Sequence, residues 1–307
     1  MGTSDFAVPS LRALARAHTV AAVISRPDSC CGRGLRLTPS PVSIAARELG
    51  LPVFCPDRLG ESAFLDELRG LGADMFFVTA FRILPPAVFT MPPLGTVNLH
   101  GSILPDYRGA APIQRAVMNG DAETGLTTFY IEESVDTGDI ILTERISIGP
   151  DETSGELMAR MSVIGADLAV RTTDLIASGN APRTPQPTSP GRPAPKLVKE
   201  DGRIDWSRDA PSIHNLVRGA NPDPGAFTPW LRGPLKILRS RVAAGSSEGQ
   251  PGTIASASPA TGFTVRCGTG ALDILELQPP GKRPMDAASF ARGYRIGPGM
   301  SIETGCS

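Results

Sequence analysis

The chain of 307 residues is poor in cysteine, histidine and aromatic side chains, with five Cys, three His and 5% aromatic residues. The five Cys show no Cys-x-x-Cys spacing, and the three His are scattered along the chain, so no tetrahedral zinc site is expected. We therefore predict a protein without a bound metal, whose thiols stay reduced in the cytoplasm.

Long hydrophobic runs are also absent. No stretch approaches the ~18 consecutive apolar residues that a membrane span needs, and the N-terminus lacks the basic-then-apolar pattern of a secretory signal. Both absences argue against a membrane protein. The hydrophobic content of 41% and the charged content of 20% are typical of globular proteins, and the length allows two domains with separate cores.

A strong excess of either charge is missing too, since the net charge is −1. The balance is uneven, however: residues 201–307 hold 12 Lys and Arg against 9 Asp and Glu, whereas residues 1–200 hold 18 against 22. A mildly basic C-terminal part is compatible with contacts to an RNA backbone. A solvated surface explains the same asymmetry about as well.

The first half of the chain alternates short apolar runs with helical patterns, which predicts an α/β fold with a Rossmann-like, mainly parallel sheet. The expected strands are residues 20–25, 75–79 and 96–100, followed by two neighbouring antiparallel strands at 126–131 and 140–148. The expected helices are residues 42–49, 61–71, 112–118 and a long helix that ends near Ile176, opened by a capping box at Thr153–Glu156.

The second half has a different pattern. Residues 178–200 begin with a stretch dense in Pro, Ser and Gly, which indicates a linker between a catalytic domain over residues 1–177 and a C-terminal domain over residues 201–307. The C-terminal domain is expected to be a small OB-like β-barrel. Its predicted strands are residues 204–206, 234–241, 252–257, 263–267 and 272–277.

The most informative segment places polar side chains at the end of a predicted strand. Asn98 and His100 are two residues apart, so along a strand they point to the same side, and Gly101 allows a ligand to approach the backbone. A carboxylate, Asp136, follows in an Asp-Thr-Gly-Asp turn. An Asn-x-His pair alone is more often structural than catalytic, so the pair indicates a catalytic site only together with its sequence context.

That context is specific. The run Asn98–Gly109 (NLHGSILPDYRG), the following AAPIQR and the downstream DTGD resemble the folate-dependent formyltransferases, and most closely those that act on methionyl-tRNA. The resemblance implies that 10-formyltetrahydrofolate is the co-substrate. It further implies catalytic roles for Asn98, His100 and Asp136, and folate contacts from Ser102, Ile103, Leu104 and Pro105.

These roles suit formyl transfer, in which negative charge builds on the formyl oxygen and the leaving folate nitrogen takes a proton. Asn98 donates its amide to the oxyanion, a contribution of typically ~2.7–4 kcal/mol. Protonated His100 donates likewise and acts as general acid. Asp136 holds His100 in its charged form, because a nearby carboxylate favours an imidazolium.

Two further regions resemble the enzymes that use methionyl-tRNA. Residues 26–41 match a long loop that in the family contacts the tRNA acceptor end, so the resemblance implies tRNA contacts from Arg33 and Arg36 and a place for Phe6 near the methionyl group. In this loop Ser29-Cys30-Cys31 and Leu35-Arg36 replace more basic family residues. Residues 194–206 and 278–285 match further family segments in the C-terminal part. The implied partner is initiator methionyl-tRNA, and a monomer is expected.

Two alternatives remain open at this point. The first is a formyltransferase on the same fold that acts on an amino sugar or on glycinamide ribonucleotide. Residues 201–307 argue against the small glycinamide enzyme, and Ala110–Arg115 differs from the sequence typical of amino-sugar enzymes. The second is a non-catalytic RNA-binding protein with a relic site, against which the intact trio of Asn98, His100 and Asp136 argues.

The start of the chain is unusual for this resemblance. Family members have a strand that ends in a Gly-Thr-x-x-Phe turn, and this sequence has that turn at Gly2–Phe6 with no strand before it. The first strand of a doubly wound sheet is normally central. We therefore expect the sequence as given to lack a central strand of its sheet.

Overall fold

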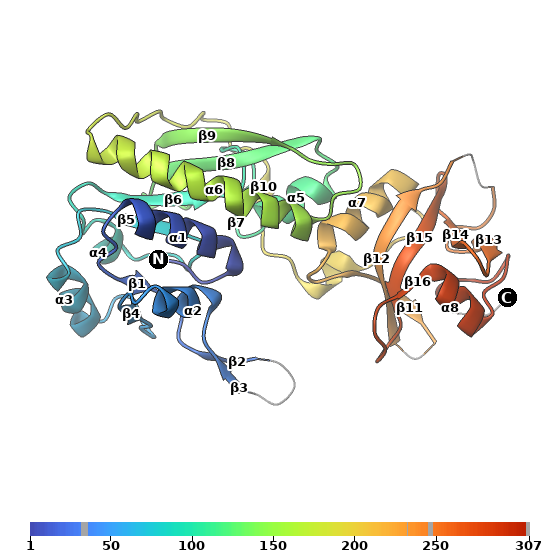
Figure 1. The fold of residues 1–307 in the computed structure, drawn as a ribbon. Coiled ribbons are helices and arrows are strands. Elements are labelled where there is room, and N and C mark those ends of the chain that lie inside the picture. The colour runs from blue at the N-terminus through green and yellow to red at the C-terminus, as the bar shows by residue number, and fades with distance from the viewer. Residues whose placement is uncertain (32–35, 232, 245–247, 305–307) are drawn as a thin grey trace. The chain divides into compact units, whose positions relative to one another are not determined.

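The computed structural model describes residues 1–31, 36–231, 233–244 and 248–304 (Figure 1). The chain divides into two compact units, and each is described by itself. Unit 1 consists of residues 1–112, 123–147 and 158–195, and unit 2 of residues 113–122, 148–157 and 196–307. Within the described residues, no helix combines the length and the apolar character needed to cross a membrane.

Unit 1 is built on a four-stranded sheet in the order β5-β6-β8-β9, comprising Phe76–Thr79, Thr96–His100, Glu123–Tyr130 and Ile140–Ser147. Strands β5 and β6 are parallel, whereas β6-β8 and β8-β9 are antiparallel. The predicted mainly parallel sheet is therefore a mixed one, with one parallel and two antiparallel pairings. A separate parallel pair, β1 (Val23–Ile24) with β4 (Val53–Phe54), occupies only part of the strand expected over residues 20–25.

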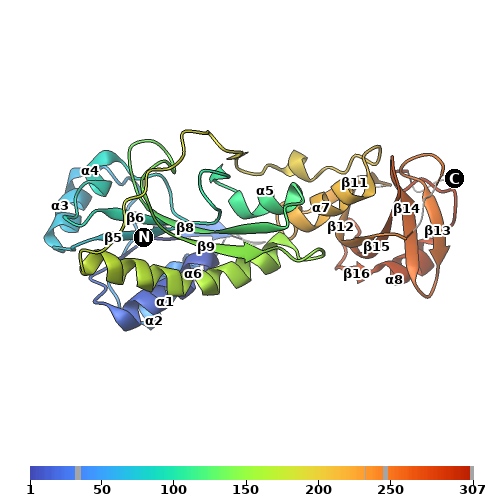
Figure 2. The same cartoon turned by 90° about the horizontal axis from the view of Figure 1, so that it is seen from above.

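The long helix α6 (Ser154–Ala177) lies along the sheet, as Figures 1 and 2 show, with α1 (Val8–Ala17) beside it. A side chain at Gly165 would collide with Leu99 and Leu126, so this glycine sets the close approach of helix and sheet. The predicted capping box is confirmed: Glu156 accepts a hydrogen bond from the Thr153 N–H at 2.9 Å, and its own N–H donates to the Thr153 hydroxyl.

The other elements of unit 1 are short. They are η1 (Asp5–Ala7), β2 (Ser29–Cys31), β3 (Arg36–Thr38), α2 (Pro41–Glu48), α3 (Ser62–Gly70), α4 (Pro86–Phe89), β7 (Arg108–Gly109) and β10 (Pro193–Ala194). Helix α5 (Pro112–Met118) begins at the edge of unit 1 and belongs mostly to unit 2. It matches the predicted helix at both ends.

Unit 2 contains a six-stranded antiparallel sheet in the order β11-β12-β15-β14-β13, with β16 paired to β15. The strands are Ala226–Trp230, Gly233–Val242, Ala271–Gln278, Gly262–Arg266, Ile254–Ser258 and Met285–Asp286, and the helices are η2 (Lys199–Gly202), α7 (Ala210–Ala220) and α8 (Ala287–Tyr294). Among the described strands, β11 and β13 do not pair, so the sheet is not closed. The structure thus shows a sheet-rich unit. The OB-like barrel expected from the sequence is more specific than these strand pairings support.

One predicted strand of unit 2 is wrong. Residues 204–206 form no strand; only Arg203 makes an isolated bridge to Phe227, and Trp206 lies in a turn. The apolar character of the segment has another cause, because Ile204 and Trp206 are buried in the core of unit 2. The Trp206 indole N–H donates to the Thr228 hydroxyl at 3.1 Å.

The segment predicted as a linker, residues 178–200, lies mainly within unit 1. Thr184 pairs with Ile140 at the edge of the sheet, and β10 pairs in parallel with β7. The predicted domain boundaries remain a prediction, while the contacts show that this proline-rich stretch is part of the structure around β7.

Candidate active site

His100 is the last residue of β6, and its side chain is buried with 6% exposed. Asn98 lies two residues earlier on the same face of the strand, because side chains alternate along β6. Leu99, between them, faces the opposite side, where it contacts Gly165 of α6. The amide and the imidazole therefore share the face of the sheet that α6 does not cover.

Asp136 lies against the His100 ring. Its Oδ2 atom is 3.7 Å from Nδ1 of His100, and the carboxylate is mostly buried, with 12% of the side chain exposed. On the other side of the ring, Nε2 lies 2.8 Å from the Tyr107 carbonyl oxygen, which can only accept, so Nε2 donates. The Phe129 ring meets His100 edge-on at 6.4 Å between centroids. The imidazole is thus fixed between an acceptor carbonyl and a carboxylate.

The Asp136 backbone is held in an uncommon conformation. Its φ is +56°, in the left-handed region. The Asp136 carbonyl oxygen accepts hydrogen bonds from Nε of Arg108 and from the Gln186 amide, both at 2.9 Å. The carboxylate Oδ2 in addition accepts from the Gly109 N–H at 2.9 Å. These contacts determine where the carboxylate points.

Gln186 was not anticipated from the sequence, although it is central to this arrangement. Its amide nitrogen also donates to the Gly138 carbonyl, and its oxygen accepts from Arg108. Farther along the same segment, Gly191 has φ +65° and approaches the Pro105 carbonyl so closely that a Cβ atom would lie 2.4 Å from it. No local signal marks a glutamine in a proline-rich stretch as part of a site 50 residues earlier.

The four residues predicted to contact folate form a buried turn after β6. Ser102 is fully buried, and its hydroxyl donates to the Asp106 carbonyl at 2.5 Å. Leu104 is 4% exposed, and its N–H donates to the Thr127 hydroxyl. Ile103 and Pro105 are partly exposed. The Ser102 hydroxyl and the Leu104 N–H therefore stabilise the turn, and the folate contacts of the four residues remain a prediction.

The residues predicted to contact tRNA are only partly placed. Phe6 lies in η1 and is buried, with 8% exposed. Arg36 begins β3, whose pairing with β2 is described for the backbone. Arg33 lies outside the described residues. Among the residues that the structure describes, no three His, Cys, Asp or Glu side chains gather as they would around a metal ion.

An amide and a buried imidazole on one strand face, with a carboxylate beside the imidazole, suit acyl or formyl transfer. Two family models match the chain: "Formyl transferase" over residues 1–173, and "Formyl transferase, C-terminal domain" over residues 196–295. The chain therefore belongs to the formyl transferase family.

Within this family, the relatives found are methionyl-tRNA formyltransferases, which confirms the resemblance seen in the sequence. The enzyme of Porphyromonas gingivalis is 46% identical over 315 residues, which cover 99% of this chain and 97% of the relative. That of Symbiobacterium thermophilum is 47% identical, covering 95% and 91%. That of Moorella thermoacetica is 46% identical, covering 100% and 98%.

Solved structures show the same fold in more distant proteins. An N-formyltransferase from Helicobacter canadensis, in complex with folinic acid and dTDP-3-aminofucose, aligns with a TM-score of 0.66 at 20% identity, covering 89% of this chain and 97% of that one. A sugar 3N-formyl transferase aligns with a TM-score of 0.65 at 18% identity, covering 89% and 95%. At these identities the likeness concerns the fold alone.

Proposed function

We propose that the chain transfers the formyl group of 10-formyltetrahydrofolate to the α-amino group of initiator methionyl-tRNA. The observation that carries this proposal is the His100–Asp136 pair, at 3.7 Å, on the same strand face as Asn98. Relatives at 46–47% identity over nearly the whole chain bear the name of this activity. The sugar-formylating proteins reach only 18–20% identity, so they support the fold rather than a sugar substrate.

The chemistry follows from the three side chains. The substrate amine attacks the formyl carbon, a C–N bond forms, and the formyl oxygen becomes an oxyanion to which the Asn98 amide donates. The bond to the folate N10 then breaks, and its electron pair stays on N10, which takes a proton. His100 gives that proton and receives the one released by the attacking amine, so the protons balance.

Asp136 and Tyr107 have distinct parts in this scheme. The Tyr107 carbonyl fixes Nε2 at 2.8 Å, whereas Nδ1 and the Asp136 carboxylate are 3.7 Å apart. The contact to Asp136 is the looser of the two. The Asp136 carboxylate faces Nδ1 and helps to orient the ring.

We place the tRNA on the loop of residues 26–41 and on unit 2, with Arg33, Arg36 and Phe6 as its predicted contacts. Replacement of Arg33 by Glu is expected to raise the KM for methionyl-tRNA much more than the KM for the folate, because a phosphate contact is lost while the His100 site is untouched. Binding should also weaken as salt rises. Equal effects on both KM values would assign the loop to folate binding.

The overall assignment is tested by consumption of 10-formyltetrahydrofolate in the presence of methionyl-tRNA, a nucleotide-linked amino sugar, or neither. We expect turnover only with methionyl-tRNA, and a loss of ~10²–10³ in kcat for Asn98→Ala. Turnover with the amino sugar instead would favour the alternative substrate class. RNA binding without any turnover would favour a relic site.

A further inference from the structure

Arg192, in the proline-rich segment after α6, is joined to the turn that follows β6. Its N–H donates to Oδ1 of Asp106 at 2.9 Å, and its guanidinium lies 3.4 Å from Oδ2 of the same carboxylate. Its carbonyl oxygen accepts from the Tyr107 N–H at 2.5 Å. The guanidinium also lies over the Tyr107 ring, 4.4 Å from the ring centroid. Arg192 therefore contacts both Asp106 and Tyr107 through its main chain and through its side chain.

The neighbours of Arg192 are held against the same turn. Gly191 approaches the turn so closely that a Cβ atom would lie 2.4 Å from the Pro105 carbonyl oxygen. The next two residues form β10, which pairs in parallel with β7. All of these residues belong to unit 1. We call residues 191–194 the strap, and it lies along residues 105–109.

Tyr107 connects the strap to His100. Its backbone has a φ of +62°, a region in which a tyrosine is uncommon, and the residue is buried, with 3% exposed. Such a conformation persists where the surrounding contacts determine it, and here the strap holds the Tyr107 N–H and ring. The carbonyl oxygen of the same residue accepts from Nε2 of His100 at 2.8 Å. The strap therefore determines where the acceptor of the His100 ring points.

The Tyr107 carbonyl in turn determines which nitrogen of a neutral His100 ring carries the proton. A carbonyl oxygen only accepts, so the proton of the neutral imidazole stays on Nε2. Nδ1, 3.7 Å from the Asp136 carboxylate, is then the nitrogen with the free lone pair. In the proposed formyl transfer, Nδ1 is consequently the atom that takes the proton of the attacking amine and gives a proton to the leaving folate N10.

We propose that the strap positions His100: Arg192, bound to Asp106 and Tyr107, holds the neutral imidazole in its Nε2–H form and leaves Nδ1 to exchange protons with the substrates. The three residues act through His100, so they are positioning residues. The expected effect on turnover rests on the proposed function, whereas the expected effect on the ring does not.

Nitrogen NMR of histidine-labelled protein tests the effect on the ring, at about pH 9, where histidine side chains are ordinarily neutral. The chain has three His, and the His100 signals are identified by their loss in His100→Asn. The unaltered chain should show only the Nε2–H form at His100. Arg192→Ala and Asp106→Ala should show a mixture of the Nε2–H and Nδ1–H forms. Asp106→Asn keeps an oxygen that accepts from the Arg192 N–H, so it should stay closer to the unaltered chain.

Formyl transfer is the second measurement. We expect kcat to fall by about tenfold in Arg192→Ala and in Asp106→Ala, with the KM values of both substrates unchanged, because only the His100 ring is affected. The matched control is Arg183→Ala. Arg183 belongs to the same proline-rich segment and also lies over an aromatic ring, that of Tyr130, at 3.8 Å from the centroid. This variant should keep both its kcat and the Nε2–H form of His100.

The proposal would be overturned by an Nδ1–H form in the unaltered chain, or by an unchanged ring in both Arg192→Ala and Asp106→Ala. An equal effect of Arg183→Ala would also overturn it, and a changed ring with an unchanged kcat would remove the strap from the reaction. The signals of the other two histidines should not move, which shows that each variant is folded. If the unaltered chain did not formylate methionyl-tRNA, the proposed function would fail, and the NMR result alone would decide whether the strap positions His100.

Discussion

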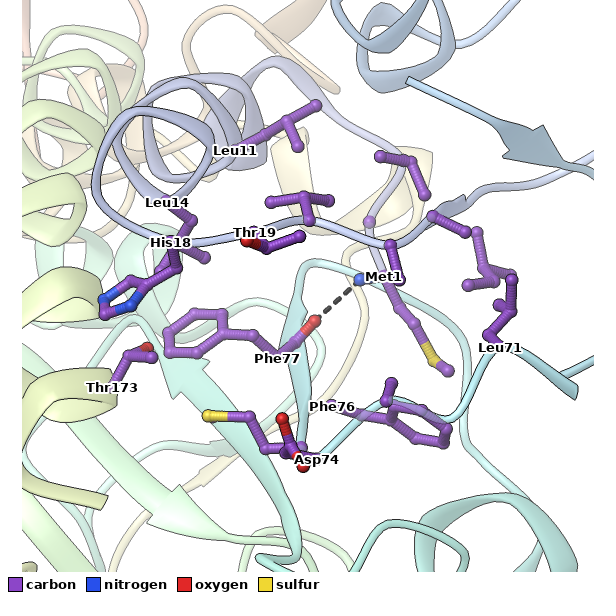
Figure 3. Close-up of a pocket in the computed structure, with 18 of the residues that line it drawn as sticks. Met1, Leu11, Leu14, His18, Thr19, Leu71, Asp74, Phe76, Phe77 and Thr173 are labelled. Atoms are coloured by element: carbon purple, nitrogen blue, oxygen red, sulfur yellow. Dashed lines mark hydrogen bonds between the residues drawn. The ribbon is translucent and has the colours of Figure 1, made fainter. Parts of the chain in front are cut away.

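The His100 site and the cavity of about 540 Å³ beside Met1 (Figure 3) both belong to unit 1, yet their backbone polar groups are satisfied to different degrees. At the site, the Asp136 carbonyl accepts two hydrogen bonds from side chains, and the Gly109 N–H is bonded to the Asp136 carboxylate. At the cavity, two strand edges face an apolar space, and a chain amine is buried between them. A segment far along the sequence completes the site, whereas Met1 and Gly2, at the start of the chain, line the cavity. We therefore expect changes at the site to alter turnover, and changes at the cavity to alter stability.

The largest expected effect comes from Asp136. Asp136→Asn keeps an oxygen that accepts from the Gly109 N–H and removes the charge that faces His100. We predict a loss of ~10²–10⁴ in kcat, the range for a lost proton-transfer group. Because Asn tolerates a positive φ well, stability should change little. The measurement is single-turnover formyl transfer beside urea unfolding.

Asp136→Ala is the matched variant. It should lose as much activity as the Asn variant, and in addition ~1–2 kcal/mol of stability, because Ala tolerates a φ of +56° poorly. If Asp136→Asn instead kept near-normal turnover, the carboxylate charge would have no part in catalysis and the site would be purely structural.

The second prediction concerns the cavity and pH. The pKa of the Met1 amine falls from 8.0 to about 5 on folding, because burial disfavours the charge. Between these values the unfolded chain binds a proton that the folded chain does not, so the free energy of unfolding rises with pH from about 5 to 8. At ~1.4 kcal/mol per unit of pKa, the upper bound is about 4 kcal/mol.

Urea unfolding at pH 5.5 and 8.5 measures this slope, and Nα-acetylation of the same chain is the control. Histidines and carboxylates titrate alike in both forms, so the difference between the slopes isolates the amine. An identical slope with and without the acetyl group would show that the amine is not buried in the folded chain.

The two regions differ in how much of their structure could be predicted from the sequence. Strand β6 and helix α5 were predicted with the observed bounds, because an apolar run that ends in polar residues and a proline at the first turn are local signals. The alternation of side chains along a strand is also a local signal, and it predicted that Asn98 and His100 lie on one face.

Nonlocal contacts are the part that the sequence could not supply. The bonds from Gln186 to Asp136 and from β10 to β7 join residues 50 or more positions apart, and the proline-rich composition around them indicated only a linker. Likewise, the apolar residues of segment 204–206 suggested a strand, although they serve the core of unit 2 from a turn. Burial alone does not distinguish these two outcomes.

The third prediction tests whether the distant segment positions the site. Gln186→Leu removes the donor to the Asp136 and Gly138 carbonyls while keeping most of the side-chain volume. We expect kcat to fall by about tenfold, the equivalent of ~1.4 kcal/mol, with the KM values unchanged, because the Asp136 carboxylate is no longer held toward His100.

The matched control is Gln278→Leu in unit 2, whose amide donates to the Lys282 carbonyl at an exposed position. This variant should keep its kcat. If both glutamine variants lost activity equally, or if only the KM values changed, Gln186 would have no positioning role at Asp136.

The last prediction uses one substitution in both regions. Thr127 is fully buried, donates to the Ser102 carbonyl at 2.7 Å and accepts from the Leu104 N–H, whereas the Thr79 hydroxyl is buried without a partner. Thr127→Val leaves two buried groups unpaired and should lower the free energy of unfolding by ~1–3 kcal/mol. Thr79→Val replaces an unsatisfied hydroxyl by a methyl group, so it should be neutral or stabilising by up to ~1 kcal/mol. Urea unfolding should show changes of opposite sign in the free energy of unfolding of the two variants, if the polar groups at the site are hydrogen-bonded and the Thr79 hydroxyl is not. A comparable loss of stability in both variants would mean that the Thr79 hydroxyl has a partner in solution. The contrast between the two regions would then fail.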